Sequence, residues 1–164
     1  MEELVPIRSG DQVEVVTDVI NRSFLTVAKD FGFTKESVSH FPAFIGKEVL
    51  EKQIRNGLQM FCFISEDTCI GCIGIKREDD NGLYKIERLA VLPERRHNAI
   101  GRALMDFAVK EIRKEGGKRA IVEIVNENTQ LKNWYIGQGF IEIRIDTYER
   151  LPFTVGVLEK DLSR

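Results

Sequence analysis

Apolar residues recur at the spacing of an α-helix in four segments of the chain. In the first segment, Val15, Val16, Val19 and Ile20 lie three or four residues apart or side by side, so their side chains share one helix face. A glycine follows each of the other three segments, as is common where helices end. The four predicted helices cover about residues 11–29, 47–56, 101–115 and 128–138.

Apolar or alternating runs between these helices predict seven strands. The run at 119–125 is almost continuously apolar, which is typical of a strand buried on both faces. At 141–146 three isoleucines alternate with charged residues, which predicts a half-buried strand. The predicted strands cover about residues 4–8, 60–65, 69–76, 84–92, 119–125, 141–146 and 153–160.

The order of these elements predicts the fold class. The chain runs strand, two helices, three strands, helix, strand, helix and two strands. Early strands joined by tight turns favour antiparallel hairpins, whereas the later strand–helix–strand unit favours a parallel pair. We therefore predict one α/β domain over residues 1–164, with a mixed, mostly antiparallel sheet of about seven strands and helices on both faces.

Composition and charge exclude several classes of partner. The chain is 43% hydrophobic and 30% charged, as globular proteins are. A net charge of -2 and a pI of about 5.8 provide no basic surface for nucleic acid or an anionic membrane. No apolar run reaches the roughly 20 residues of a membrane span, and the first residues lack the apolar region of a secretion signal. We therefore expect a cytoplasmic protein without nucleic-acid or membrane partners.

The three cysteines, Cys62, Cys69 and Cys72, lie in apolar runs predicted as strands. Cys69 and Cys72 have C-x-x-C spacing, but a redox or zinc pair favours a loop or a helix start, and zinc needs further ligands. Two strand residues three apart point to opposite faces. We therefore predict buried structural thiols, no metal site and a reducing compartment.

The stretch 89–104, LAVLPERRHNAIGRAL, joins a predicted strand to an amphipathic helix through a basic loop. Unpaired N–H groups of such a loop and of the first helical turn, together with the helix dipole, can bind an anion such as pyrophosphate. Ala99 and Gly101 are small enough to let a phosphate approach the backbone, and Arg96 and Arg102 could add charge. These features alone suit an ordinary connection with solvated arginines equally well.

Two motifs resemble the GNAT superfamily of N-acetyltransferases. The first, Val91-x-Pro93-x-x-Arg96-x-x-Ala99-Ile100-Gly101-x-x-Leu104, is similar to that family's acetyl-CoA-binding signature. The second is Asn128 followed by Trp134-Tyr135-x-x-x-Gly139-Phe140. The resemblance covers the chain from about Phe61 onward.

The chain departs from the signature at Ala99, where the family has glycine. If this position needs a positive φ, alanine costs roughly 1–2 kcal/mol. If it needs only a small side chain, little is lost. The departure bears on the tightness of CoA binding.

The resemblance implies acetyl-CoA as cosubstrate and no metal. The backbone of Leu89 and Val91 would pair with the pantetheine arm, Asn128 would contact the CoA chain between two separating strands, and Tyr135 would face the sulfur. The pyrophosphate would lie against Arg96, His97, Asn98, Ala99, Ile100, Gly101 and Arg102. The resemblance also divides the chain into a variable substrate-side segment, 1–58, and a CoA-binding core, 59–164.

The implied reaction moves an acetyl group to a primary amine. An alkylammonium has a pKa of about 10.4, so a base must first remove a proton. Glu87 is the candidate base, although a carboxylate paired with Lys85 or Arg88 explains it equally well. A backbone N–H near Val91 could stabilise the oxyanion, and Tyr135 could protonate the departing thiolate as general acid.

Two alternatives belong to other functional classes. An NAD-dependent oxidoreductase would need a G-x-G-x-x-G motif after its first strand, and the chain has none. A non-catalytic acetyl-CoA-binding sensor or scaffold of the same fold would keep the anion site without turnover.

The acceptor is less defined than the cofactor. His40, Phe41 and Phe44 either line an acceptor pocket or pack the first helices onto the sheet, and packing is favoured. The acceptor amine is left open between small molecules and peptides. The resemblance also allows a homodimer through the last strands.

Overall fold

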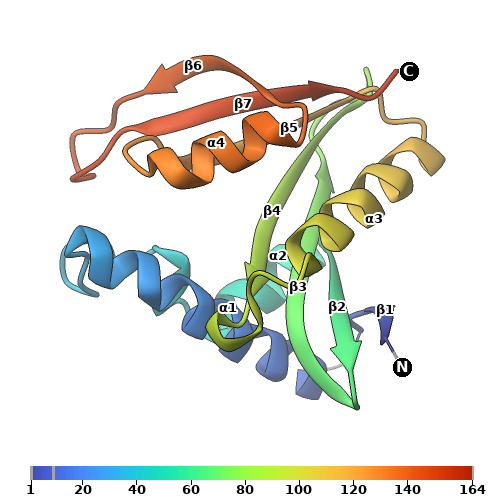
Figure 1. Cartoon of the computed structure of the whole chain (residues 1–164), viewed down its shortest axis with the longest axis horizontal. Coiled ribbons are helices and arrows are strands. Elements are labelled where there is room, and N and C mark those ends of the chain that lie inside the picture. The colour runs from blue at the N-terminus through green and yellow to red at the C-terminus, as the bar shows by residue number, and fades with distance from the viewer. Residues whose placement is uncertain (1, 9, 164) are drawn as a thin grey trace.

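A seven-stranded sheet in the order β1-β2-β3-β4-β5-β7-β6 forms the centre of the molecule (Figure 1). The computed structural model describes residues 2–8 and 10–163. Neighbouring strands are antiparallel except β4 and β5, which are parallel. The strands are β1 (Glu2–Pro6), β2 (Gln59–Ser65), β3 (Thr68–Arg77), β4 (Leu83–Val91), β5 (Arg119–Val125), β6 (Ile141–Asp146) and β7 (Val155–Asp161). The predicted fold class is confirmed.

Four α-helices cover the sheet, with α1 and α2 on one face and α3 and α4 on the other (Figure 1). They are α1 (Gly10–Phe31), α2 (Lys47–Arg55), α3 (Ile100–Lys114) and α4 (Thr129–Gly137). Every predicted helix and strand is present, with boundaries within two residues of those expected. Local periodicity and turn residues were therefore sufficient to locate the elements.

The buried face of α1 is narrower than predicted. Val16, Val19 and Ile20 are buried in the core, but Val15 is 51% exposed. The stripe continues through Val13 instead, three residues before Val16.

The prediction that β6 is half-buried is wrong. Ile141, Ile143 and Ile145 are 66%, 42% and 48% exposed. β6 is the last strand of the sheet and pairs only with β7 among the described strands. The alternating sequence of β6 therefore does not indicate a buried face, because no described helix covers its isoleucines.

A cluster of aromatic side chains connects the end of α1 to the loop before β7. Phe41 is buried and packs edge-on against Phe24, Phe33 and Phe153, with ring centroids 5.2–6.4 Å apart. Phe41 thus packs, as favoured from the sequence, and together with His40 it also lines the cleft described below, so the two alternatives are not exclusive. His40 is exposed.

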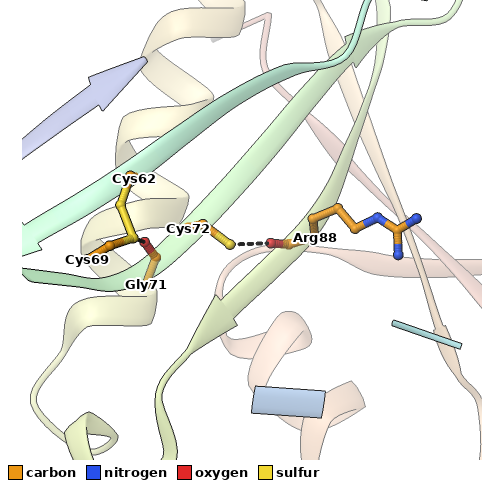
Figure 2. The surroundings of a disulfide bond; sticks show 5 residues. All are labelled: Cys62, Cys69, Gly71, Cys72 and Arg88. Atoms are coloured by element: carbon orange, nitrogen blue, oxygen red, sulfur yellow. Dashed lines mark hydrogen bonds between the residues drawn. A yellow bond between two sulfur atoms is a disulfide. The ribbon is translucent and has the colours of Figure 1, made fainter. Parts of the chain in front are cut away.

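The cysteine prediction needs correction. A disulfide joins Cys62 in β2 to Cys69 in β3, and Cys72 alone is a free buried thiol (Figure 2). Cys72 lies opposite Cys62, so Cys69 and Cys72 share a face of the sheet. A register shift between Phe63 and Ile64 breaks the expected alternation. Cysteine usage therefore no longer supports a reducing compartment.

Burial affects the remaining thiol chemically. It raises the pKa of Cys72 to about 12, against a small opposing effect of Arg88. Cys72 is therefore a poor nucleophile and metal ligand at neutral pH. Within residues 2–8 and 10–163, no group of three His, Cys, Asp or Glu side chains could hold a metal ion. No helix in the same residues is long and apolar enough to cross a membrane.

Gly117, in the connection from α3 to β5, lies where α3 packs against Tyr84 of β4 and allows a test of this packing. A Cβ on Gly117 would lie 2.2 Å from Ile112 Cγ2 and 2.8 Å from Tyr84 Cδ1. Gly117→Ala should therefore lower the free energy of unfolding by about 1–3 kcal/mol in urea titrations. Gly137→Ala is the control, because nothing lies within 4 Å of its added Cβ and stability should hold or rise by up to about 1 kcal/mol. Equal effects of the two variants would contradict this packing.

Candidate functional site

A cleft opens where β4 and β5 separate. The two strands pair at only three positions, from Leu83↔Arg119 to Lys85↔Ile121, and then diverge (Figure 1). The space between them belongs to a cleft of about 1260 Å³ that is bounded by α1, α2, β4, β5, α4 and the loop before α3. Its volume exceeds that of a typical pocket for a drug-sized ligand.

The loop before α3 presents a row of free backbone donors. Within the described chain, the N–H groups of residues 97–102 have no backbone acceptor, and the first bonded N–H is that of Ala103, to Ala99 O at 3.1 Å. Ala99 has φ 60 and His97 has φ 67, both in the left-handed region. This backbone turns successive N–H groups towards the start of α3, where the helix dipole favours an anion.

These donors fit a pyrophosphate. His97 and Ala99 are exposed at the mouth of the cleft, and Gly101 has space before Trp134, whose ring would be 3.5 Å from an added Cβ. A group of unpaired N–H donors at a helix start is the arrangement that binds phosphates in proteins. The donor set therefore suits the diphosphate of CoA.

The structure brings nearly all the predicted site residues to one cleft. The cleft is lined by Glu87, Leu89, Val91, Arg96, His97, Ala99, Ile100, Gly101, Arg102, Asn128 and Tyr135. Asn98 is the exception, and its Nδ2 donates to Arg95 O within the loop.

Val91 presents its N–H to the gap between the strands. Leu92 N donates to the carbonyl of Ile70 in β3. Because the N–H groups of successive strand residues point to opposite sides, the N–H of Val91 points away from β3. The carbonyl of Val91 accepts from Arg96 Nε at 3.3 Å. Val91 therefore has an available donor beside the cleft.

The guanidinium of Arg96 is bound by the protein. Its Nη1 donates to Thr26 Oγ1 at 3.1 Å and its Nη2 to Ser23 O at 2.7 Å, in addition to the bond to Val91. Burial lowers the pKa of Arg96, but an arginine stays charged in water. Its side chain thus fastens the loop to α1, and the sequence-based role of adding charge at the phosphate site stays a prediction.

Asn128 begins α4. Its Oδ1 accepts from Leu131 N at 3.2 Å, which caps the helix, and its side-chain amide remains on the cleft wall. The cap fixes the direction in which α4 leaves β5. Contact of Asn128 with a CoA chain stays a prediction.

Glu87 lies in a chain of charges along the cleft. Its Oε2 is 3.6 Å from Lys85 Nζ, and Lys85 is also 3.4 Å from Glu123 Oε2 in β5. All three side chains are half-buried or at the margin of exposure. The anticipated pairing with Lys85 is present, so Glu87 is held in place beside the gap.

Tyr135 is enclosed in the wall of the cleft. It is 6% exposed and lies edge-on between Trp134 and Phe140, with centroids at 5.1 Å and 5.5 Å. Burial raises the pKa of the Tyr135 hydroxyl far above its ordinary value near 10. The phenol is therefore protonated at neutral pH and can act only as a proton donor or hydrogen-bond partner.

Two residues of the cleft carry no local signal in the sequence. Arg88 has φ 58 where β3 and β4 lose register, and such a bulge depends on strand pairing. Ser23 of α1 lines the cleft, and its Oγ is the buried side-chain oxygen without a hydrogen-bond partner in the described residues. Only the folded α1 shows that this hydroxyl has a vacant hydrogen-bonding position.

Comparison with known proteins agrees with this geometry. Residues 29–151 match the sequence model of the acetyltransferase (GNAT) domain. The uncharacterised N-acetyltransferase C663.13c of Schizosaccharomyces pombe is 35% identical over 75 residues, which are 44% of this chain and 51% of that protein. The chain thus matches about half the length of this relative.

Solved structures share the fold across the whole chain. The PaiA N-acetyltransferase of Thermoplasma acidophilum, solved in complex with coenzyme A, aligns with a TM-score of 0.76 and 20% identity, covering 98% of this chain and 99% of its own. The ribosomal-protein-S18-alanine N-acetyltransferase of Escherichia coli has a TM-score of 0.78 and 14% identity, covering 100% and 96%. At these identities the likeness concerns the fold.

The left-handed backbone at Ala99 yields a test of the loop. Glycine adopts φ 60 without a Cβ penalty, so Ala99→Gly should raise the free energy of unfolding by about 0.5–1 kcal/mol. Ala103→Gly, one turn further along α3, should instead lower it by about 1 kcal/mol. Both are measured by urea unfolding. A loss of stability in Ala99→Gly equal to that of the control would show that this loop is not strained.

Proposed function

Because the chain belongs to the GNAT family of acetyltransferases, we propose that it transfers an acetyl group from acetyl-CoA to a primary amine. The observation that supports this best is the row of free N–H groups at residues 97–102, beside a cleft of about 1260 Å³. The remaining cleft residues supply the groups that amine acetylation requires.

The cosubstrate would lie between the diverging strands. Its diphosphate would meet the N–H groups of residues 97–102, and its pantetheine arm would follow β4 at Leu89 and Val91. The amide of Asn128 would contact the arm from α4. When bound, acetyl-CoA supplies an activated acetyl thioester.

Glu87 would accept the proton that an ammonium must lose before it attacks. The carboxylate reaches the cleft from β4, and Lys85 orients it through the ion pair at 3.6 Å. The amine nitrogen would then form the C–N bond, and the N–H of Val91 would stabilise the negative oxygen of the tetrahedral intermediate. Glu87 would pass the first proton to water and then accept the second proton, which the nitrogen loses once the C–N bond has formed.

Tyr135 would protonate the sulfur as the C–S bond breaks. Burial raises the pKa of the hydroxyl, so it carries its proton at neutral pH and could donate it to the departing thiolate. Since burial moves the pKa above 10, ionisation of Tyr135 should not reduce the rate below about pH 10. The phenolate left behind would regain its proton from solvent.

The first experiment is calorimetric titration with acetyl-CoA, with NAD as control, followed by an assay of CoA release with a panel of amines. We expect acetyl-CoA to bind, NAD not to bind, and release to depend on the amine. A sensor of the same fold would bind acetyl-CoA without amine-dependent release. Absence of acetyl-CoA binding at millimolar concentration would refute the proposal.

The catalytic roles can be separated by substitution. Tyr135→Phe and Glu87→Gln should each lower kcat by about 10²–10⁴-fold with acetyl-CoA binding retained. Glu159→Gln, at an ion pair with Arg119 outside the cleft, is the matched control and should keep its kcat. Full turnover by Tyr135→Phe would remove the general-acid role.

A homodimer through β6 remains part of the proposal. Ile141, Ile143 and Ile145 are exposed on an edge strand, where apolar side chains and free backbone groups favour pairing with a second copy. Sedimentation should detect a dimer that dissociates in Ile143→Lys, since a charge would be buried in the interface. A monomeric native chain at tens of micromolar would exclude it.

A further inference from the structure

Arg88 occupies an unusual position in the cleft wall. It lies in β4 directly after Glu87, and its φ of 58 interrupts the strand where Cys72↔Ala90 and Gly74↔Glu87 leave two residues opposite one. A left-handed arginine costs about 1–2 kcal/mol, and such strain is found mainly at functional sites. Glu87 and Arg88 both line the cleft, as do the other residues of β4 from 85 to 91.

The guanidinium of Arg88 has a neutral partner. Its Nη2 donates to Gln53 Oε1 of α2 at 3.1 Å, and no carboxylate of the described residues lies within 4.0 Å. The side chain is half-buried and leaves β4 in the direction opposite to Cys72 and the disulfide (Figure 2). Burial lowers the pKa of Arg88, and the negative charge of the neighbouring Glu87, which makes no ion pair with it, opposes this effect only in part. A desolvated guanidinium is normally matched by an anion.

The other positively charged side chains of the cleft are paired with protein groups or solvated by water. Lys85 is paired with Glu87 and Glu123, and Arg96 donates to three protein acceptors. Arg102 and Arg150 are exposed, so water solvates them. Arg88 is therefore partly buried, and among the described residues its guanidinium has one hydrogen-bond acceptor, Gln53 Oε1.

The position of Arg88 separates it from the phosphate site. It is three residues from Val91, about 10 Å along an extended strand, on the side away from residues 97–102. Its contact with Gln53 places the guanidinium beside α2. In the proposed reaction the cosubstrate occupies the side of residues 97–102, so an anion that pairs with Arg88 would belong to the acceptor.

We propose that Arg88 binds a carboxylate of the acceptor, so that the acceptor is an amino acid or a short amino carboxylic acid. The inference rests on the N-acetyltransferase function proposed above. The planar fork binds a carboxylate through two parallel hydrogen bonds, and Glu87, the preceding residue, would face the amine of the same molecule. Both residues line the same cleft.

The test uses matched acceptors that differ only at the carboxylate. Rates of CoA release are compared for amino acids and their carboxamides, such as glycine with glycinamide and L-alanine with L-alaninamide, together with β-alanine and γ-aminobutyrate and their amides. The readout is the ratio of kcat/KM for acid to amide. Comparing this ratio between enzyme variants cancels the different amine pKa values of acid and amide.

Arg88→Gln should lower the ratio by about 10- to 100-fold, because two charge-assisted hydrogen bonds are lost. Gln53→Glu provides an independent test that does not disturb the bulge. A carboxylate at position 53 would pair with Arg88 and compete with that of the acceptor, so the ratio should fall while the melting temperature rises. A purely structural role of Arg88 would change the melting temperature and leave the ratio constant.

The outcomes separate this inference from the function on which it rests. Turnover of uncharged amines but of no amino carboxylate, or a ratio that neither variant changes, would overturn the assignment of Arg88 alone. A preference for amino phosphates over amino carboxylates would also overturn it. Binding of acetyl-CoA without release to any amine would overturn the transferase function and this inference together.

Discussion

The separation of β4 from β5 is the constraint on which the site depends. The strands pair at three positions and then leave backbone groups such as the N–H of Val91 without a partner strand. Unpaired backbone groups in a sheet interior are costly, so a gap of this kind is stable only if something else supplies hydrogen bonds and apolar contact. α4 and the loop before α3 close it from two sides, and a strand-like ligand would complete it.

Most of the fold could be predicted because its signals are local. Helical spacing, turn residues and the apolar run at 119–125 gave every element to within two residues. The basic loop with Ala99 and Gly101 also predicted free N–H groups at the start of α3, which the structure contains, whereas anion binding there stays a prediction. The structure adds that Ala99 requires a left-handed backbone, a question that the sequence left open.

The features that were missed depend on contacts distant in the sequence. Arg96 bonds to Thr26 and Ser23, 70 and 73 positions away, and no periodicity reports such a contact. The bulge at Arg88 and the disulfide between Cys62 and Cys69 arise from register shifts between strands. The exposure of β6 was predicted wrongly because alternating residues show only that the two faces of a strand differ in polarity. They do not show that another element covers the apolar face.

The hydrogen bonds of Arg96 affect how freely the sequence of α1 can change. Two of its three acceptors are main-chain carbonyls, Val91 O and Ser23 O, and the third is the hydroxyl of Thr26. Every residue has a main-chain carbonyl, so two of these three hydrogen bonds do not depend on the side chains of α1. Mutations that reshape the cleft-facing side of α1 can therefore accumulate without loosening the loop before α3, and these two parts of the cleft wall are free to evolve at different rates.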